Sequence, residues 1–435
     1  MTEMVEQQVR VSSIAQKVEA RLKQRYAVEK RFRFYGIASI AIALAFLAVL
    51  LTSIIGRGYS AFVQSEVQLS VALDPAEIDP DGTRDPKVLG HADYAALAKA
   101  ALAARFPEAA ANRGTRRELF SLLSPGADLE VRKVVLGDPS LIGSVVKVWV
   151  PVTSQVDQLI KGHMSRDINQ GGQFNEAQLG WIDSLRADGS LTLKFNKWLF
   201  TNGDSRQPEL AGLWGAVVGS FYSLLITLGL SFPLGVATAI YLEEFAPKNR
   251  WTDVVEVNIN NLAAVPSIVF GLLGLEMFLN VFGLPRSAPF VGGLALTLVS
   301  LPTIIIAARV ALKAVPPWIR EAALGLGASK LQMVVDHVLP LAMPGILTGT
   351  IIGMARAIGE SAPLLMIGMV AFIVDVPATP WDPSTVLPVQ IYLWAASPER
   401  AFVERTSAAI IVLLLFLAVM NAAAIYLRKK FERRW

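Results

Sequence analysis

The sequence predicts an all-α polytopic membrane protein with six transmembrane helices and an α+β domain inserted between the first two. Three observations support this fold class. Hydrophobic residues make up 53% of the 435 residues and charged residues only 17%, a balance too apolar for an ordinary soluble domain. Six stretches approach the roughly 20 apolar residues that a helix needs to cross the hydrocarbon core. Residues 57–210, in contrast, mix both charge signs with modest apolar segments.

The N-terminal part is expected to be a basic cytoplasmic segment, residues 1–33, followed by the first transmembrane helix, residues 34–56. This apolar run starts too late and is too long for a cleaved signal peptide, so we interpret it as a retained span. Basic residues flank the first and the last apolar run, for example Arg33 and Lys430. Positive flanks favour the cytoplasmic side, so both termini are expected there, in the inner membrane. Attraction to anionic lipid is the alternative.

Residues 57–210 are expected to form an extracytoplasmic domain, because their length suffices for an independent fold. The alanine-rich segment 91–106 has a helical pattern, whereas 131–140 and 143–154 have strand-like patterns. Segment 190–205 ends in an Asn-Gly turn signal. The sequence of this domain contains no nucleophile-plus-base or metal-ligand constellation.

The other spans are expected at residues 214–241, 257–282, 291–312, 345–374 and 408–427. They form a membrane domain, residues 211–435, whose connection 313–330 has the basic residues typical of cytoplasmic loops. Pro266 predicts a kink in the third span, and Arg309 is expected to snorkel outward from the end of its span. The chain has no cysteine and three histidines. This excludes a disulfide framework, and the scattered histidines predict no metal site.

The connection after the fourth span has the most specific local pattern. Residues 321–345 predict a short helix, a break at Gly325 and Gly327, and a second helix running to Pro340. Such an element on the membrane surface can present one rigid knob to a cytoplasmic partner. A plain connecting loop is the alternative.

The order of residues in this connection resembles the EAA loop of type I ABC-importer permeases. A glutamate and two alanines are followed by a glycine and then by a Leu-Pro pair: Glu321, Ala322, Ala323, Gly327, Leu339 and Pro340. Segments 263–275, 301–330 and 347–365 are similar, in addition, to PstA-type permeases, the membrane subunits of phosphate ABC importers. The resemblance implies an ABC permease transmembrane domain at 211–435 whose loop 313–340 couples to an ATPase.

The resemblance also implies the partners. They are a second, PstC-like permease, a PstB-like ATPase dimer, a periplasmic PstS-like phosphate-binding protein, phosphate and the lipid bilayer, with no cofactor and no nucleic acid.

Residues 325–330 lack the spacing of a phosphate-binding loop, so the chain is expected not to be an enzyme. Domain 57–210 departs from the compact members of the family. It could dock the binding protein, pack on the second permease or act as a sensor.

Two charges interrupt the fifth predicted span, Arg356 and Glu360, spaced i, i+4 on one helix face. Each costs on the order of 2.5–3.5 kcal/mol at a helix centre, so the pair is expected to face the protein interior or an aqueous path. Arginine offers a planar fork that suits phosphate oxygens, and a nearby glutamate weakens the site enough for release. Ser361 would add a hydroxyl, and Pro363 would disturb the helix just beyond. The resemblance assigns the arginine and glutamate to transport; an ion pair that only holds helices together is the alternative.

Other functions account for fewer of these features. An ABC permease for another oxyanion, such as molybdate or sulfate, would use the same charged pair. A membrane-anchored sensor or envelope enzyme would need neither six spans nor charges within one of them. A secondary transporter would have no use for an EAA-type loop. The sequence therefore predicts the permease subunit of an ATP-driven phosphate importer.

Overall fold

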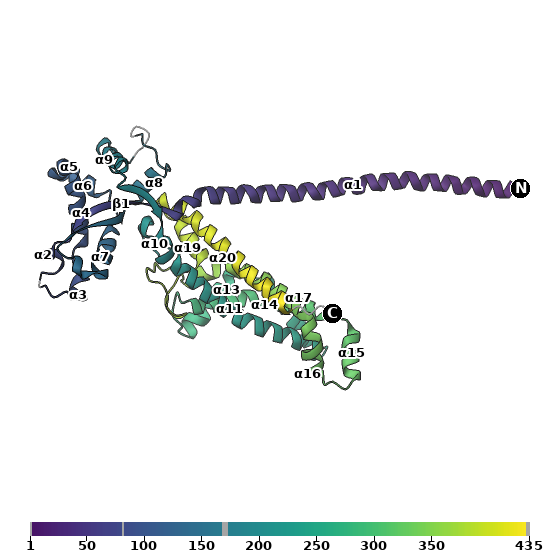
Figure 1. Cartoon of the computed structure of the whole chain (residues 1–435). Helices are drawn as coiled ribbons and strands as arrows, with labels where there is room; N and C mark the ends of the chain where they lie inside the picture. The colour runs from purple at the N-terminus through teal and green to yellow at the C-terminus, as the bar shows by residue number, and fades with distance from the viewer. Residues whose placement is uncertain (1, 81, 168–172, 432–435) are drawn as a thin grey trace. The chain divides into compact units, whose positions relative to one another are not determined.

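The computed structural model describes residues 2–80, 82–167 and 173–431, and the chain separates into two compact units at residue 56 (Figure 1). The first unit lies in helix α1 (Thr2–Gly58), which runs through the predicted polar segment and the first span. Neither proline nor glycine occurs before Gly36, and the polar residues there include many good helix formers. The change of composition near residue 33 thus falls within one helix.

All six predicted spans have counterparts among the described residues. Five helices are long and apolar enough to cross a membrane: Arg25–Phe62, Trp214–Phe245, Pro289–Lys313, Lys330–Gly359 and Ala401–Lys430. A bent pair, Arg250–Ala264 and Ser267–Val281, is the sixth when it is counted as one broken span. The predicted fold class is confirmed.

The membrane domain of the second unit consists of long helices separated by short ones. Its elements are α11 (Trp214–Ile240), η5 (Tyr241–Phe245), α12 (Arg250–Ala264), α13 (Ser267–Gly274), η6 (Leu275–Val281), α14 (Pro289–Lys313), α15 (Pro317–Gly325), α16 (Lys330–Gln332), η7 (Met333–Val338), α17 (Leu339–Gly359), α18 (Ala362–Met366), α19 (Leu387–Ala395) and α20 (Ala401–Phe431), with η5, η6 and η7 π-helical. Small residues let the long helices approach closely. A Cβ atom on Gly349 of α17 would lie 2.1 Å from the Cβ of Ala307 of α14.

The third predicted span is two helices. Helix α12 ends at Ala264, the backbone is extended at Val265, and α13 follows Pro266, with an angle of 101° between the two parts of the span. Proline has no N–H to donate and disfavours the helical conformation of the residue before it. The predicted kink at Pro266 is confirmed, and it is a complete break.

Residues 57–210 combine a three-stranded sheet with helices and are called the sheet domain below, although they belong to the same compact unit as the membrane helices. Its elements are η1 (Tyr59–Phe62), β1 (Val63–Ala72), α2 (Pro75–Ile78), α3 (Pro86–Leu89), α4 (Tyr94–Arg105), α5 (Pro107–Ala111), α6 (Arg113–Phe120), α7 (Ala127–Gly137), η2 (Pro139–Leu141), β2 (Val145–Pro151), α8 (Ser154–Ile160), α9 (Glu176–Ala187), β3 (Leu191–Phe195), α10 (Lys197–Thr201) and η4 (Pro208–Leu210). The strands are antiparallel in the order β2-β1-β3, and Val67 of β1 pairs with Val150 and Leu191.

The predicted helix at 91–106 is α4 and the predicted strand at 143–154 contains β2, but the strand predicted at 131–140 is wrong. Those residues form most of helix α7. Val131 and Val135 are fully buried one helical turn apart, so the four-residue period outweighs the β propensity of valine.

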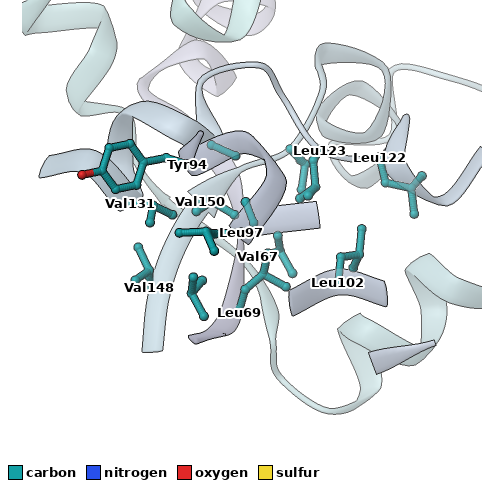
Figure 2. Close-up of a cluster of buried hydrophobic side chains, with 14 of the residues drawn as sticks. Val67, Leu69, Tyr94, Leu97, Leu102, Leu122, Leu123, Val131, Val148 and Val150 are labelled. Atoms are coloured by element: carbon teal, nitrogen blue, oxygen red, sulfur yellow. The ribbon is translucent and has the colours of Figure 1, made fainter. Parts of the chain in front are cut away.

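Buried side chains of the strands and of helices α4 and α7 form the core of the sheet domain. Figure 2 shows ten of them labelled: Val67, Leu69, Tyr94, Leu97, Leu102, Leu122, Leu123, Val131, Val148 and Val150. The hydroxyl of Tyr94 donates a hydrogen bond to the carbonyl of Leu89 at 2.7 Å, so its polar end is satisfied inside the core.

A junction cluster of buried charges joins the sheet domain to the first turn of α20. Lys161 Nζ lies 2.6 Å from Asp157 Oδ2 and 2.9 Å from Glu404 Oε1, and none of the three side chains is more than 5% exposed. Arg405 and Glu209 complete the cluster, each 3% exposed. Buried charges require partners of opposite sign. The sheet domain is therefore attached to α20 by specific ionic contacts.

Candidate functional site

Arg356 and Glu360 lie at the end of helix α17. Helix α17 ends at Gly359, Arg356 is in its last turn, and Glu360 follows with extended backbone. The span predicted to reach residue 374 therefore ends earlier, and the pair moves from a helix interior to a helix terminus. Nε of Arg356 is 3.5 Å from Oε1 of Glu360, so the two side chains meet as the i, i+4 spacing predicts. A cation in the last turn also interacts favourably with the helix dipole.

Pro363 explains where this helix ends. A proline ring clashes with the carbonyl of the residue four positions earlier, which here is Gly359. Helix α17 stops at that residue, and α18 begins with Pro363 in its first turn, where proline is well tolerated. Glu360 and the half-buried Ser361 connect the two helices. The predicted disturbance is confirmed.

The short helix α18 packs against α13. A Cβ atom on Gly271 would lie 2.6 Å from the Cα of Pro363, so this contact of the two helices requires glycine. Helix α13 follows the break in the third span at residues 265–266, and α18 follows the end of α17 at residues 360–361. Non-helical backbone at membrane depth is tolerated only where protein buries it or where it lines a watery cavity. By this rule, non-helical segments such as residues 265–266 and 360–361 would be buried by protein or line a polar cavity if they lie at membrane depth.

The charged pair leaves the arginine able to bind an anion. The Arg356 side chain is 50% exposed and that of Glu360 20% exposed. Within the described part of the chain, Arg356 makes no hydrogen bond other than the one from Nε to Glu360. Its two terminal nitrogens form a planar fork that suits an oxyanion.

The EAA loop contains the predicted glycine break. Gly327 has a φ of +90°, a left-handed conformation that residues with a Cβ disfavour. Ser329 then caps the next helix, and its hydroxyl accepts a hydrogen bond from the N–H of Gln332 at 3.2 Å. This helix does not stop at Pro340 as predicted. The π-helical turn η7 precedes the proline, and the chain continues helically to Gly359, because a wider turn accommodates the missing N–H.

The residues predicted to couple to an ATPase differ in burial. The exposed ones are Glu321, Ala322 and Gly327. Ala323 is buried, and Leu339 and Pro340 are half-buried. Ala323 packs in one cluster with Met333 and Val334 of η7. The second alanine of the motif thus holds the two helices of the loop together, while the glutamate and first alanine face outward.

Large apolar side chains are exposed around these residues. Leu326 is 90% exposed, Trp318 66% and Leu331 62%. Large apolar side chains exposed along one loop are typical of a protein interaction site. In Figure 1, α15 and α16 lie at the opposite end of the second unit from strand β1.

Arg320 fixes the EAA loop to the membrane helices. This role of Arg320 was not predicted from the sequence. One of its terminal nitrogens lies 2.8 Å from Oε1 of Glu244, whose side chain is only 6% exposed. The guanidinium also donates to the carbonyls of Leu312, at 2.9 Å, and Val315, at 2.7 Å. The adjacent glutamates at the end of the second span were the available signal.

The expectation that Arg309 snorkels outward is wrong. Its side chain is 9% exposed, and its guanidinium lies 2.5 Å from Glu243 and 2.7 Å from Glu256. Two carboxylates compensate the burial of the arginine. This contact ties together η5, α12 and α14 near the EAA loop.

Two family models match the chain. Residues 231–435 match the "Binding-protein-dependent transport system inner membrane component". Residues 19–170 match a "Domain of unknown function (DUF3333)".

Several curated proteins are similar to the membrane domain. The phosphate transport system permease protein PstA 1 of Mycobacterium tuberculosis is 34% identical over 223 residues, which cover 51% of this chain and 72% of the relative. The PstA protein of Haemophilus influenzae is 30% identical over 226 residues, 51% of this chain and 78% of the relative. The probable ABC transporter permease protein YqgI of Bacillus subtilis is 36% identical over 188 residues, 43% of this chain and 63% of the relative.

Among solved structures, a chain of the MetNI methionine ABC transporter in an inward-facing conformation is similar, with a TM-score of 0.42 and 20% identity. The match covers 51% of this chain and 98% of that chain.

Proposed function

The chain belongs to the PstA-type family of ABC-importer permeases, multi-pass proteins of the inner membrane, and on this premise we propose that it imports inorganic phosphate as one permease subunit of an ATP-driven complex. It forms half of the translocation path, and a second, PstC-like permease forms the other half. A PstB-like ATPase dimer hydrolyses the ATP, and a PstS-like binding protein delivers phosphate. The phosphate permeases among the relatives support this substrate.

The observation that carries the substrate class is the charged pair at the end of α17. Among the residues that the structure describes, the two terminal nitrogens of Arg356 have no partner, and Glu360 lies beside them, which suits weak, reversible binding of an oxyanion. Half of the arginine side chain is exposed on this chain. A second permease packed on that face would enclose the arginine, which supports a path between two subunits.

The EAA loop supports coupling to an ATPase. Its exposed apolar side chains suit docking, and the chain is helical from Lys330 to Gly359. Movement of a docked ATPase would therefore shift Arg356 through one continuous helix. Arg320 would pass the same movement to η5 and to the end of α14.

The orientation follows from this role. The EAA loop and both termini lie in the cytoplasm, and the sheet domain lies outside the cell membrane. Basic residues at Lys248, Arg250 and Lys313 support this arrangement through the positive-inside rule.

Molybdate and sulfate are the second candidate substrates, because both are oxyanions that suit the same arginine fork.

The test of the proposed function is uptake of radiolabelled phosphate by proteoliposomes that contain the chain, the second permease, the ATPase and the binding protein. We expect uptake that requires ATP and is blocked by unlabelled phosphate but not by sulfate or molybdate. Uptake that persists without the ATPase would contradict the ABC mechanism, and preferential competition by sulfate or molybdate would change the substrate.

A further inference from the structure

One corner of the sheet domain has exposed aromatic side chains. Along one face of β3 the exposed fraction rises from 4% at Leu191 to 47% at Leu193 and 60% at Phe195. Leu191 pairs with the buried Val67 of β1 on the core face of the sheet. The core face therefore continues beyond the side chains that cover it. Phe195 stacks on Phe200 of α10, with ring centroids 5.5 Å apart.

The corner is fixed to the segment that follows the first span. Phe200 also stacks on Phe62 of η1, at 5.9 Å. The backbone N–H of Asn196 donates to the carbonyl of Phe62 at 2.9 Å, and the side-chain amide of Asn196 donates to the carbonyl of Ala61 at 2.9 Å. Phe62 is the last residue of the helical segment Arg25–Phe62, which contains the first apolar span. The aromatic rings therefore lie just beyond the C-terminal end of that span.

The corner is fixed equally to the segment that precedes the second span. The N–H of Leu213 donates to the carbonyl of Leu199 in α10 at 2.8 Å, and Leu199 is fully buried. The second span begins at the next residue, Trp214. Two independent attachments thus hold α10 and the end of β3 next to the ends of the first and second spans.

The surroundings of the rings have the chemistry of a membrane interface. Tyr59 is 63% exposed and Trp214 46% exposed, and these amphipathic residues favour the headgroup level. Lys197 at the start of α10 is exposed as well, and its ammonium group suits lipid phosphates.

We propose that this aromatic corner, consisting of Tyr59, Phe62, Leu193, Phe195 and Phe200, is inserted in the headgroup layer of the lipid bilayer. The sheet domain then rests on the membrane surface through α10 and the end of β3, in addition to its covalent links to two spans. Interfacial elements of this kind lie about 5–10 Å into the boundary between headgroups and acyl chains. Lipid is favoured over a protein partner because the corner lies beside two span ends and because Trp214 and Lys197 are exposed next to it.

The absence of native cysteines allows a direct test. A bimane label is placed at Thr201→Cys, an exposed position at the end of α10, in the full-length chain purified with its co-purifying subunits. The matched control is Val145→Cys, which is 68% exposed and pairs with Ala72 at the other end of β1. Both proteins are reconstituted into phosphatidylcholine–phosphatidylglycerol vesicles with or without lipid that has a spin label at the headgroup.

We expect the headgroup spin label to quench bimane at position 201 and to leave bimane at position 145 unaffected, with aqueous iodide giving the opposite order. Replacing both Phe195 and Phe200 by serine should abolish the lipid quenching at position 201. Leu193→Ser serves the same purpose if the double variant does not assemble. Equal lipid quenching at the two labelled positions would overturn the proposal. Protection of position 201 from both quenchers would overturn it too, because a protein subunit would then cover the corner.

Discussion

At the scale of single residues, Arg356 is the side chain on which the proposed anion path depends most, because its terminal nitrogens have no partner in the described part of the chain. Hydrogen bonds to charged groups contribute about 1.5–3 kcal/mol, so Arg356→Gln should lower the initial rate of phosphate uptake by about 10- to 100-fold. Arg356→Lys keeps the charge without the planar fork and should give an intermediate rate. Arg400→Gln removes an exposed arginine outside this site and should transport normally.

Glu360→Gln distinguishes a path from a simple ion pair. On a path, the glutamate competes with the anion for Arg356, so its loss should strengthen anion retention and slow turnover. If the pair only holds helices together, both glutamine variants will lose thermal stability by similar amounts and transport normally per assembled complex. Uptake rates normalised to the amount of complex, together with unfolding midpoints, separate these results.

Glu209 makes stability depend on pH. Burial raises its pKa above the ordinary value of 4.5, although a hydrogen bond from Ser124 and the charge of Arg405 act in the other direction. The folded state therefore binds the proton of Glu209 more tightly than the unfolded state does. This difference stabilises the folded protein fully below about pH 4.5, and the stabilisation is lost as the pH rises through the pKa of the folded state. Glu209→Gln stays neutral, so its unfolding midpoint relative to the natural protein should rise as the pH increases above about 4.5. A difference that does not change with pH, as expected for the exposed control Glu399→Gln, would contradict this.

At the scale of elements, the left-handed turn of the EAA loop requires glycine at one of two nearby positions. Gly327 has a φ of +90°, whereas Gly325 has open space and no such conformation. Left-handed backbone costs a residue with a Cβ roughly 1–2 kcal/mol, so Gly327→Ala should displace the two helices of the loop, while Gly325→Ala should be nearly neutral. We expect Gly327→Ala to insert normally but to lose ATPase co-purification and ATP-dependent uptake. Equal behaviour of the two variants would exclude a role for the turn.

Local patterns explain which elements the sequence analysis predicted. The long apolar spans, the break at Pro266 and the turn at Gly327 follow from composition and from the properties of proline and glycine. Strand β1 was missed although residues 66–71 alternate in polarity: Val67, Leu69 and Val71 are buried, and the residues between them are polar. Helix α7 was assigned as a strand because β-branched residues were weighted above their four-residue spacing.

In the candidate site, too, only the local features were predictable from the sequence. Arg356 and Glu360 are conspicuous because two charges stand in an apolar segment, and their contact is local. Arg320 and Glu244 are 76 positions apart, and Lys161 and Glu404 are 243 apart. No local sequence pattern relates residues that are so far apart along the chain, so only the three-dimensional structure reveals these ion pairs.

At the scale of the whole molecule, the junction cluster decides whether the sheet domain and α20 behave as one body. Lys161 is its central cation, between Asp157 and Glu404. Removing one partner from a buried ion pair costs about 3–5 kcal/mol, because the other charge stays buried without compensation. Lys161→Met should therefore lower the unfolding midpoint and let a protease separate the sheet domain from an otherwise intact membrane domain.

The matched control for this prediction is Arg166→Met. In the same domain, Arg166 forms an ion pair with Asp183 at 2.7 Å, and both side chains are about half exposed. Exposed pairs contribute about 0–1 kcal/mol, so this variant should behave like the natural protein. Adding Glu404→Gln to Lys161→Met removes one of the two uncompensated acids and should restore part of the stability. If Lys161→Met is as stable and as protease-resistant as Arg166→Met, other contacts hold the sheet domain in place.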